Sequence, residues 1–350
     1  MQVIRPIHTI QGEMMKRFLF FVFMFLLTGG ATTGLFADHA KVLPKNVGRF
    51  YFAPTYQWGN KAFDGEGSRK STEQSIEMFN IGLALEHGVT NWVTAALQWT
   101  PGNNIFSDIA LGTPVSADLN DMGDLFVGAK IQIIGAQAPV RSEVKRFAFA
   151  VGFKAPLTSG PDFTKEYVKM TTGEDFTASK IDKHALGAAW RLYYDHLFTK
   201  KFYLNLYNET VVYIKKGDLK NYDMTAGGII NNLGGGGKVN YGYDLTFEVD
   251  PNYTFEIAPK TDLEIHLPVN YKTTPTPEFD LYGGAAGVID VLETGATNSR
   301  ILTARPTVGI FFKGWALPIE FKLSYFAPVR GKNTNANNTI NAQIRIYYKI

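Results

Sequence analysis

The sequence predicts an all-β protein, a transmembrane antiparallel up-and-down β-barrel of about 12 strands with long outer loops and short periplasmic turns. Three observations lead to this prediction. Hydrophobic residues alternate with polar ones along most of the chain, an export signal stands at the N-terminus, and short connections alternate with long ones. The alternative is a large soluble β-sandwich or jelly roll, whose strands are shorter and less aromatic.

The clearest alternation covers residues 240–257. From Tyr241 to Ile257, most odd-numbered residues are aromatic or aliphatic, whereas the even-numbered ones are polar or acidic. A period of two indicates a strand, and strands of soluble proteins usually have only about 5 or 6 residues. The length therefore favours a tilted membrane strand. Pro251 predicts a bulge within it or, alternatively, a turn that would give roughly 14 strands in place of roughly 12.

The N-terminus predicts export. Lys16 and Arg17 precede an apolar run over residues 18–27, and small residues follow up to Ala37. This order is typical of a cleaved signal peptide at residues 1–37, of which 1–13 could reflect a mis-assigned start. An uncleaved anchor is the alternative, but the apolar run is shorter than the roughly 18 residues that span a bilayer. We expect residues 38–46 to form a periplasmic segment and 47–350 to form the barrel.

Composition excludes several classes of function. The formal net charge is +3, and removing residues 1–37, which hold Arg5, Lys16, Arg17 and Glu13, lowers it to +1. No nucleic-acid partner is expected, because such proteins concentrate basic residues on one face. The absence of cysteine excludes disulfides and a lipid-modified N-terminal cysteine. The many Phe, Tyr and Trp residues suit a lipid-facing band with aromatic girdles, so outer-membrane lipid is an expected partner.

Connection lengths set the topology. Strands are predicted over residues 47–58, 75–87, 91–100, 122–134, 146–156, 185–198, 202–215, 240–257, 261–272, 299–313, 317–327 and 339–350. Very short connections, such as 88–90 and 199–201, alternate mostly with long ones, such as 158–183, and so collect at opposite ends of a barrel. The last strand resembles the assembly signal of outer-membrane barrels, although it ends on Ile350 rather than Phe. It implies the barrel-assembly machinery as a partner.

The polar face of these strands predicts the lumen. Its charged candidates for a solute path are Arg49, Asp124, Lys130, Lys154, Arg191, Asp244, Glu248, Glu264, His266, Arg305, Lys322 and Arg345. Acidic residues gather on 240–257 and 261–272, and basic ones on the other strands. Such a distribution could place a selective field across an open lumen. Alternatively, the charges pair locally and hold the interior closed, since an unpaired buried charge is costly.

The long connection 273–298 contains an unusually apolar centre. Leu281, Tyr282, Val288, Ile289 and Leu292 would be poorly placed on a water-exposed loop. We therefore expect this loop to fold inward as a plug or ligand latch. The alternative is that it packs against other outer loops.

No enzymatic chemistry is predicted. His184 and Ser179 are the best candidates for the catalytic histidine and serine of a barrel lipid hydrolase, but no third group that would orient the histidine is identifiable. The glycines at 234–237 before Lys238 lack the following Ser or Thr of a phosphate loop. The six histidines include no pair with zinc-ligand spacing, so no metal and no cofactor are expected.

Two segments resemble a known family. Residues 82–97 and 123–131, the latter containing Gly123-Asp124-Leu125 and Gly128-Ala129-Lys130, are similar to a hairpin and a strand of the outer-membrane transporters linked to meta-pathway phenol degradation. Residues 147–160 resemble that family's next strand. The resemblance implies a channel in the outer membrane of a diderm bacterium for passive uptake of small hydrophobic or aromatic molecules, with Asp124 and Lys130 facing the lumen. The competing class is a non-transporting surface protein such as an adhesin.

Overall fold

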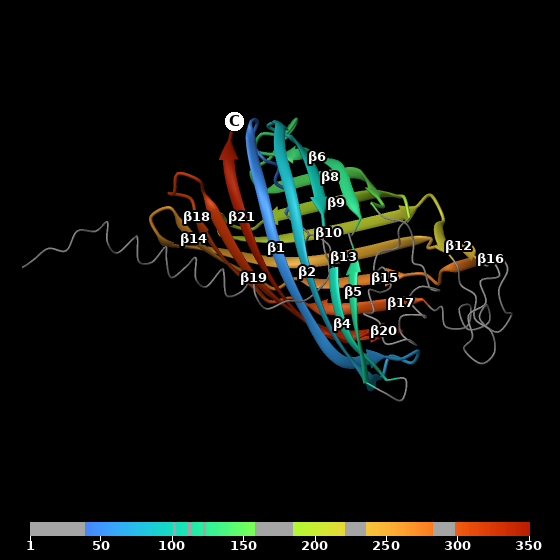
Figure 1. Cartoon of the computed structure of the whole chain (residues 1–350). Helices are drawn as coiled ribbons and strands as arrows, with labels where there is room; N and C mark the ends of the chain where they lie inside the picture. The colour runs from blue at the N-terminus through green and yellow to red at the C-terminus, as the bar shows by residue number, and fades with distance from the viewer. Residues whose placement is uncertain are drawn as a thin grey trace, which may run out of the picture.

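The computed structural model describes residues 39–100, 103–110, 114–121, 124–157, 185–220, 236–282 and 298–350. They form a closed antiparallel 12-strand β-barrel, which confirms the predicted fold class (Figure 1). The barrel closes where β1 (Val47–Phe63) pairs with β21 (Asn338–Lys349), so its first and last strands leave no open edge. Within the described part of the chain, no helix has the length and apolar character needed to cross a membrane.

Some positions in the wall are filled by one strand and others by two consecutive strands. In order, the wall contains β1, β2 (Arg69–Thr90), β3 (Val93–Trp99) continued by β4 (Asn103–Ala110), β5 (Pro114–Asp121) continued by β6 (Leu125–Gly135), β8 (Lys145–Ala155), β9 (Gly187–Leu197), β10 (Phe202–Tyr213), β13 (Tyr243–Ala258), β14 (Thr261–His266) with β15 (Val269–Thr274), β17 (Ser299–Ala304) with β18 (Thr307–Phe312), β19 (Ile319–Lys332) and β21. The short strands β7 (Val140–Arg141) and β20 (Thr334–Asn335) pair beside this wall.

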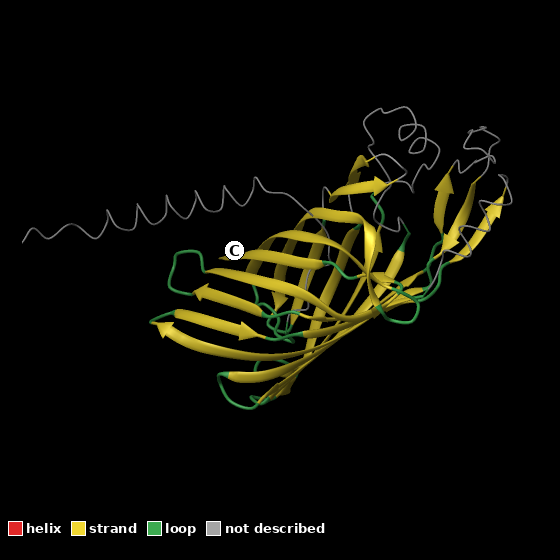
Figure 2. Ribbon diagram, turned by 90° about the horizontal axis from the view of Figure 1, so that it is seen from below, coloured by secondary structure: helices red, strands yellow, loops and turns green. Residues whose placement is uncertain are grey.

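A small sheet stands apart from the wall. β11 (Gly217–Lys220), β12 (Gly236–Asn240) and β16 (Glu278–Tyr282) form a 3-stranded sheet beyond the long-loop end of the barrel (Figures 1 and 2). Its strands come from two long connections that flank β13 and β15. Residues 278–282 of the predicted latch loop thus belong to this outer sheet, whereas residues 273 and 274 end β15 of the wall.

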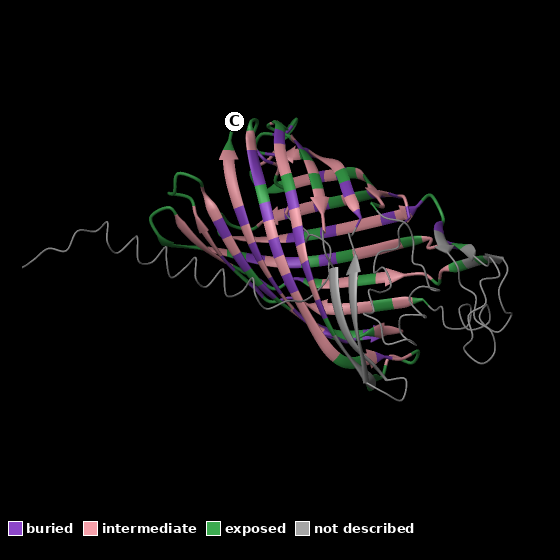
Figure 3. Cartoon of the chain, in the orientation of Figure 1, coloured by how far each residue is buried: buried purple, intermediate pink, exposed green. Residues whose placement is uncertain are grey.

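Burial alternates along the strands as the period-two pattern predicts (Figure 3). Outward side chains such as Leu85, Val127 and Phe153 are 45%, 48% and 60% exposed, which is normal only if lipid covers them. Aromatic rings gather at the short-turn end, where Phe198 stacks on Phe202 with ring centroids 5.3 Å apart and Phe312 stacks on Trp315 at 4.6 Å. Such an interfacial belt suits an amphipathic water–lipid boundary.

The region around Pro251 differs from prediction. The expected bulge at Pro251 is absent, because β13 pairs with β10 in one continuous register through Leu204↔Pro251. On its other side, β14 and β15 are separated at Leu267 and Pro268, which lie opposite Pro251 and Asp250, and the register is the same before and after the gap. Pro251 and Pro268, which have no N–H group, therefore occupy adjacent pairs of the two strands and interrupt the regular pairing without adding a residue.

Some predicted boundaries were also wrong. The strand expected from residue 240 begins at Tyr243, because Gly242 has a φ of 64° that ends β12 and turns the chain into β13. The long connections expected at 59–74 and 101–121 are largely strand, since β1 and β2 extend as a hairpin and β4 pairs with β5. The polar connection 59–74 lacks the alternation that reveals a strand, whereas β5 does alternate, with Val115, Ala117 and Leu119 between polar residues, and this signal was missed.

Candidate functional site

The predicted charged residues lie on the inner face of the barrel. Arg49, Asp124, Glu248, His266, Arg305, Lys322 and Arg345 are buried, and Lys130, Lys154, Arg191, Asp244 and Glu264 are partly buried. Side chains that alternate with them in the same strands, such as Phe247 and Leu323, point outward and are exposed. The strand period thus brings these charges together in one interior.

Charges inside the barrel pair with nearby partners. Arg49 lies 2.6 Å from Glu86 on the adjacent strand, and Lys154 lies 3.1 Å from Asp124 on its neighbour. The Arg305–Glu248 pair is 2.7 Å long, with side chains 7% and 1% exposed. These contacts support the local-pairing alternative rather than two opposed walls of unbalanced charge, because each acidic group that we name here has a basic neighbour.

A second network connects β14, β19 and β21. Lys322 lies 2.9 Å from both Glu264 and Glu320, and Arg345 approaches Glu320 at 3.5 Å. His266 contacts Glu264 at 3.3 Å and Asp250 at 3.0 Å. This network ties together strands on one side of the barrel and fills that part of the lumen with fixed, paired side chains.

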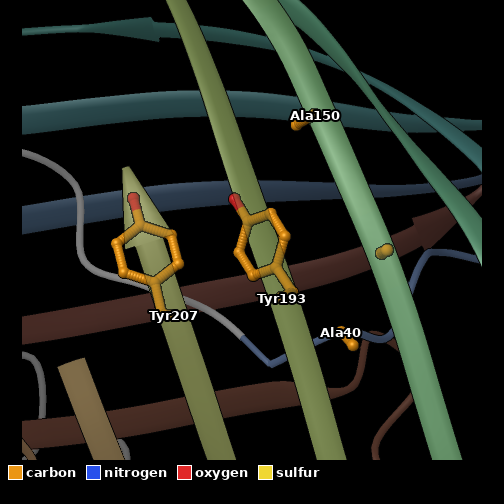
Figure 4. Packing of buried hydrophobic residues seen from close by; sticks show 5 residues of the cluster. Ala40, Ala150, Tyr193 and Tyr207 are labelled. Carbon is orange, nitrogen blue, oxygen red and sulfur yellow. The ribbon is translucent and has the colours of Figure 1, made fainter. Parts of the chain in front are cut away.

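Residues 39–46 follow the short-turn end of the barrel, with Ala40 and Leu43 buried inside it and Lys41 and residues 44–46 exposed. We expected them to precede the barrel as a periplasmic segment, but Ala40 is fully buried against Ala148, Ala150, Tyr193 and Tyr207 (Figure 4). We call residues 39–46 the inner segment. Its placement depends on contacts between residues far apart in the chain, which no local pattern predicts.

Wall side chains hold the inner segment through its backbone. The N–H of Ala40 donates to Asp195 Oδ1 at 3.0 Å, and the N–H of Leu43 donates to Thr94 Oγ1 at 2.9 Å. Gln132 Nε2 donates to the Ala40 carbonyl at 2.9 Å, and Lys130 Nζ donates to the carbonyl of residue 39 at 2.6 Å. Asp195, Thr94 and Gln132 were missed as site residues, since the groups that they bind in the inner segment are backbone groups that any sequence could supply.

A cavity lies in the lumen on the side of the wall formed by β2, β3, β6 and β8. We call it the lumen cavity. Its small residues are Ala84, Ala96, Gly128, Ala129 and Ala150, and its larger ones include Tyr51, Glu86, Phe126, Lys130, Arg191, Tyr193 and Arg345. The three aromatic residues were not predicted as site residues. The sequence signal that could have identified them is an aromatic residue at a position of the strand that belongs to its otherwise polar face.

Each aromatic ring that lines the lumen cavity lies next to the cationic group of a lysine or arginine side chain. Arg191 Cζ lies 4.2 Å from the centroid of Phe126, and Lys130 Nζ lies 4.0 Å from that of Tyr193. Arg345 Cζ lies 4.9 Å from the centroid of Tyr51. These distances are within the range of attractive cation–π contacts, so rings and charges fix one another's positions.

The glycines beside Asp124 have a steric role. Gly128 pairs with Gly152 on the next strand, and the ring of Phe126 lies across both. A Cβ built on Gly128 would lie 2.6 Å from the Val151 carbonyl oxygen, and one on Gly152 would lie 2.5 Å from Phe126 Cζ. Only glycine leaves room for the ring to lie flat against the wall.

Other predicted residues are placed elsewhere or lie outside the described residues. Leu281 and Tyr282 end β16, where they pair with Gly237 and Gly236 of the outer sheet. Val288, Ile289 and Leu292, like Ser179 and His184, fall outside the described residues. Among the residues that the structure describes, no three His, Asp or Glu side chains are grouped as metal ligands.

Comparison with known proteins supports the architecture. No protein-family model matches the sequence, and no curated protein matches it. The fold is similar to that of an outer-membrane channel from Pseudomonas putida, with a TM-score of 0.64 at 13% identity over 90% of this chain and 100% of that one. The transport unit of an Escherichia coli autotransporter has a TM-score of 0.45 at 8% identity, over 91% and 94%. A toluene transporter of P. putida scores 0.41 at 10% identity, over 87% and 90%.

Proposed function

We propose that this protein is a channel for the passive uptake of small hydrophobic or aromatic molecules across the outer membrane of a diderm bacterium. The observation that carries the proposal is a closed barrel with a cavity lined by aromatic rings and, held by Thr94 and Lys130 of that lining, a short segment that enters the lumen. The exposed apolar band of the wall supports placement in a bilayer. Export through cleavage of residues 1–37 is part of this proposal.

The inner segment is the element that we expect to control passage. It lies beside the lumen cavity, since Lys130 both lines that cavity and holds the segment. The contacts given above are hydrogen bonds rather than strand pairing with the wall. The two between neutral groups stabilise by about 1 kcal/mol each in net terms, and the two that involve Asp195 and Lys130 by about 2 kcal/mol each. Displacement of the segment would therefore open a path without unfolding the barrel.

The second candidate is a sealed surface protein whose outer loops bind a partner. The buried ion pairs and the inner segment favour it, because both fill the lumen. The outer sheet of β11, β12 and β16 would then be part of the binding surface. No catalytic role is proposed, and the inward latch formed by Val288, Ile289 and Leu292 stays a prediction.

Permeation separates the two candidates. The full-length protein would be reconstituted into liposomes and planar bilayers, and entry of polar and aromatic solutes would be compared with that into protein-free vesicles. A channel gives solute entry and discrete conductance steps. If neither kind of solute enters and no steps are seen, including after deletion of residues 39–46, the surface protein is the better description.

A further inference from the structure

We infer that one side of the short-turn rim of the barrel binds the headgroups of anionic phospholipids in the membrane leaflet next to it. The surface consists of residues 198–202, 256–262 and 312–319, which we call the basic strip. The inference depends on the placement of the barrel in a membrane and goes beyond the proposed channel function, because it holds whether or not the lumen conducts. Three features lead to it: the arrangement of three turns, their excess of lysine and the apolar wall beside them.

The three turns of the basic strip lie side by side. They connect β9 with β10, β13 with β14 and β18 with β19, and these strands are consecutive neighbours in the wall. Backbone hydrogen bonds join them: the Thr254 N–H donates to the Lys201 carbonyl at 2.8 Å, and the Lys313 N–H donates to the Lys260 carbonyl at 2.9 Å. The turns therefore form one continuous edge, at the end of the barrel away from the outer sheet (Figure 1).

Lysine dominates the charge of the basic strip. Each turn exposes at least one lysine, and together they are Lys200, Lys201, Lys260 and Lys313. The acidic residues of the same three stretches are Glu256 and Asp262. Asp262 lies 2.6 Å from Lys313 and neutralises it, so the other lysines outnumber the carboxylate that is left. Lysines gathered on adjacent turns give an edge of positive potential that attracts anions.

The backbone fixes the position of Lys260 at the tip of its turn. Its φ is 61°, a left-handed conformation that lets the chain reverse between β13 and β14. A Cβ built on Gly314 of the next turn would lie 3.2 Å from Lys260 Cδ, so the lysine stem lies across the backbone of that turn. Lys260 is nevertheless exposed. An apolar stem that rests on protein while its ammonium group extends outward is the usual arrangement of lysine at a membrane surface.

The wall beside the strip is apolar, which favours lipid over other anions. Phe198, Ile257 and Trp315 are 57%, 54% and 50% exposed, and each lies within three residues of a lysine of the strip. Aromatic contacts continue along the same edge, with ring centroids 6.4 Å apart for Phe202 and Tyr253. Such a belt lies at the boundary between hydrocarbon and headgroups, so the adjoining lysines are at the depth of lipid phosphates. An acidic protein or polymer in the aqueous phase would leave the apolar residues uncovered.

The net charge of the lipid decides between headgroups. A lysine near an anionic membrane surface strengthens binding about fivefold. The phosphate of phosphatidylcholine already has a cation in its own headgroup, whereas phosphatidylglycerol carries the same phosphodiester without one. Phosphatidylglycerol is therefore the lipid class that the basic strip should prefer.

Native mass spectrometry tests the site without any transport measurement. The full-length protein in a non-ionic detergent would be titrated with phosphatidylglycerol or with phosphatidylcholine that has the same acyl chains. We expect phosphatidylglycerol to bind about tenfold more tightly, because more than one lysine of the strip faces each headgroup.

Variants then assign the charge to the strip. The strip variant combines Lys200→Gln, Lys201→Gln and Lys260→Gln, and retains Lys313 because it pairs with Asp262. It should lose most of the preference for phosphatidylglycerol.

A matched control removes the same charge from the opposite end of the barrel. It combines Lys61→Gln, Lys215→Gln and Lys238→Gln, three exposed lysines near the long loops, and should keep the preference. Heat-modifiable gel mobility would verify that both proteins are folded barrels.

The outcomes separate this site from the channel and from other anions. Equal affinity for the two lipids, or a preference lost equally in the strip variant and the control, would overturn the inference. So would binding to purified peptidoglycan that the strip variant loses while its lipid affinity stays unchanged, since the strip would then bind an anionic polymer. A preference for phosphatidylglycerol that the strip variant alone loses would establish the site, in a conducting barrel and in a sealed one alike.

Discussion

Weakening the hold of the wall on the inner segment should increase channel opening. Thr94 Oγ1 accepts the Leu43 N–H at 2.9 Å, and Gln132 Nε2 donates to the Ala40 carbonyl at 2.9 Å. Both wall side chains are buried, with 3% and 6% exposure. The double variant Thr94→Val with Gln132→Leu keeps side chains of similar size at both positions but provides neither hydrogen-bonding group.

The expected size of the effect follows from the bonds that are lost. Each neutral hydrogen bond contributes about 1 kcal/mol, so two together favour the seated segment by about 2 kcal/mol. A change of about 1.4 kcal/mol is tenfold in an equilibrium constant, so the ratio of displaced to seated segment should rise about 30-fold. The unsatisfied Leu43 N–H and Ala40 carbonyl, which water can solvate only after displacement, act in the same direction.

Single-channel recording in planar bilayers measures this ratio as open probability. Thr55→Val is a matched control, because Thr55 Oγ1 accepts a 2.7 Å bond from Asn341 Nδ2 that is equally buried but lies within the wall, between β1 and β21. We expect the control to lower the unfolding free energy without altering open probability. An open probability that is unchanged in the double variant, or raised equally in the control, would refute the role of the inner segment.

Three further predictions concern the wall and its loops. Glu248→Gln should lower the free energy of unfolding, measured in urea, by about 3–5 kcal/mol, because Arg305 loses its charge partner at 2.7 Å. The double variant Glu248→Gln with Arg305→Gln should recover much of this loss. Equal losses in the single and double variants would contradict the prediction. Gly128→Ala should cost about 1–3 kcal/mol in the same assay, since its Cβ meets a carbonyl oxygen at 2.6 Å, and a neutral result would show that the wall shifts freely there. The hydrogen bond from Lys70 and those from backbone N–H groups lower the pKa of Asp64 to about 2. The NMR shifts of the turn at residues 64–68 should therefore stay unchanged as the pH falls below about 4 and change only near pH about 2, where Asp64 is protonated and its hydrogen bonds are lost. A titration midpoint near the usual aspartate pKa would contradict this prediction.

The side to which each strand residue points could be predicted from sequence. Alternation is a property of the extended backbone itself, so Arg49, Glu248 and Arg345 could be assigned to the inner face without knowing any neighbouring strand. The rhythm of short and long connections, with the even strand number, predicted antiparallel neighbours and closure. These features are local, and the structure confirms the fold that they imply.

Contacts between strands were decided only by the tertiary structure. Pro251 looked like a bulge in isolation, yet its partner strand carries Pro268 almost opposite, so the ladder breaks without a change of register. The pairing of charges likewise depends on strand register, which sets Arg49 directly across from Glu86. Sequence could give the sign and side of each charge, but not which partner the closed barrel brings within hydrogen-bond distance.

The inner segment shows the same limit most clearly. Residues 39–46 show no alternation of apolar and polar residues, and so short a stretch looks the same in sequence as an extension exposed to solvent. Their hydrogen bonds reach as far as Asp195, 155 residues along the chain from Ala40. Only closure of the barrel brings Thr94, Gln132 and Asp195 around one short stretch of backbone. The sequence determined the wall and the polarity of its faces because these follow from backbone geometry, whereas the content of the lumen was decided by the tertiary structure because it depends on contacts that exist only after the barrel has closed.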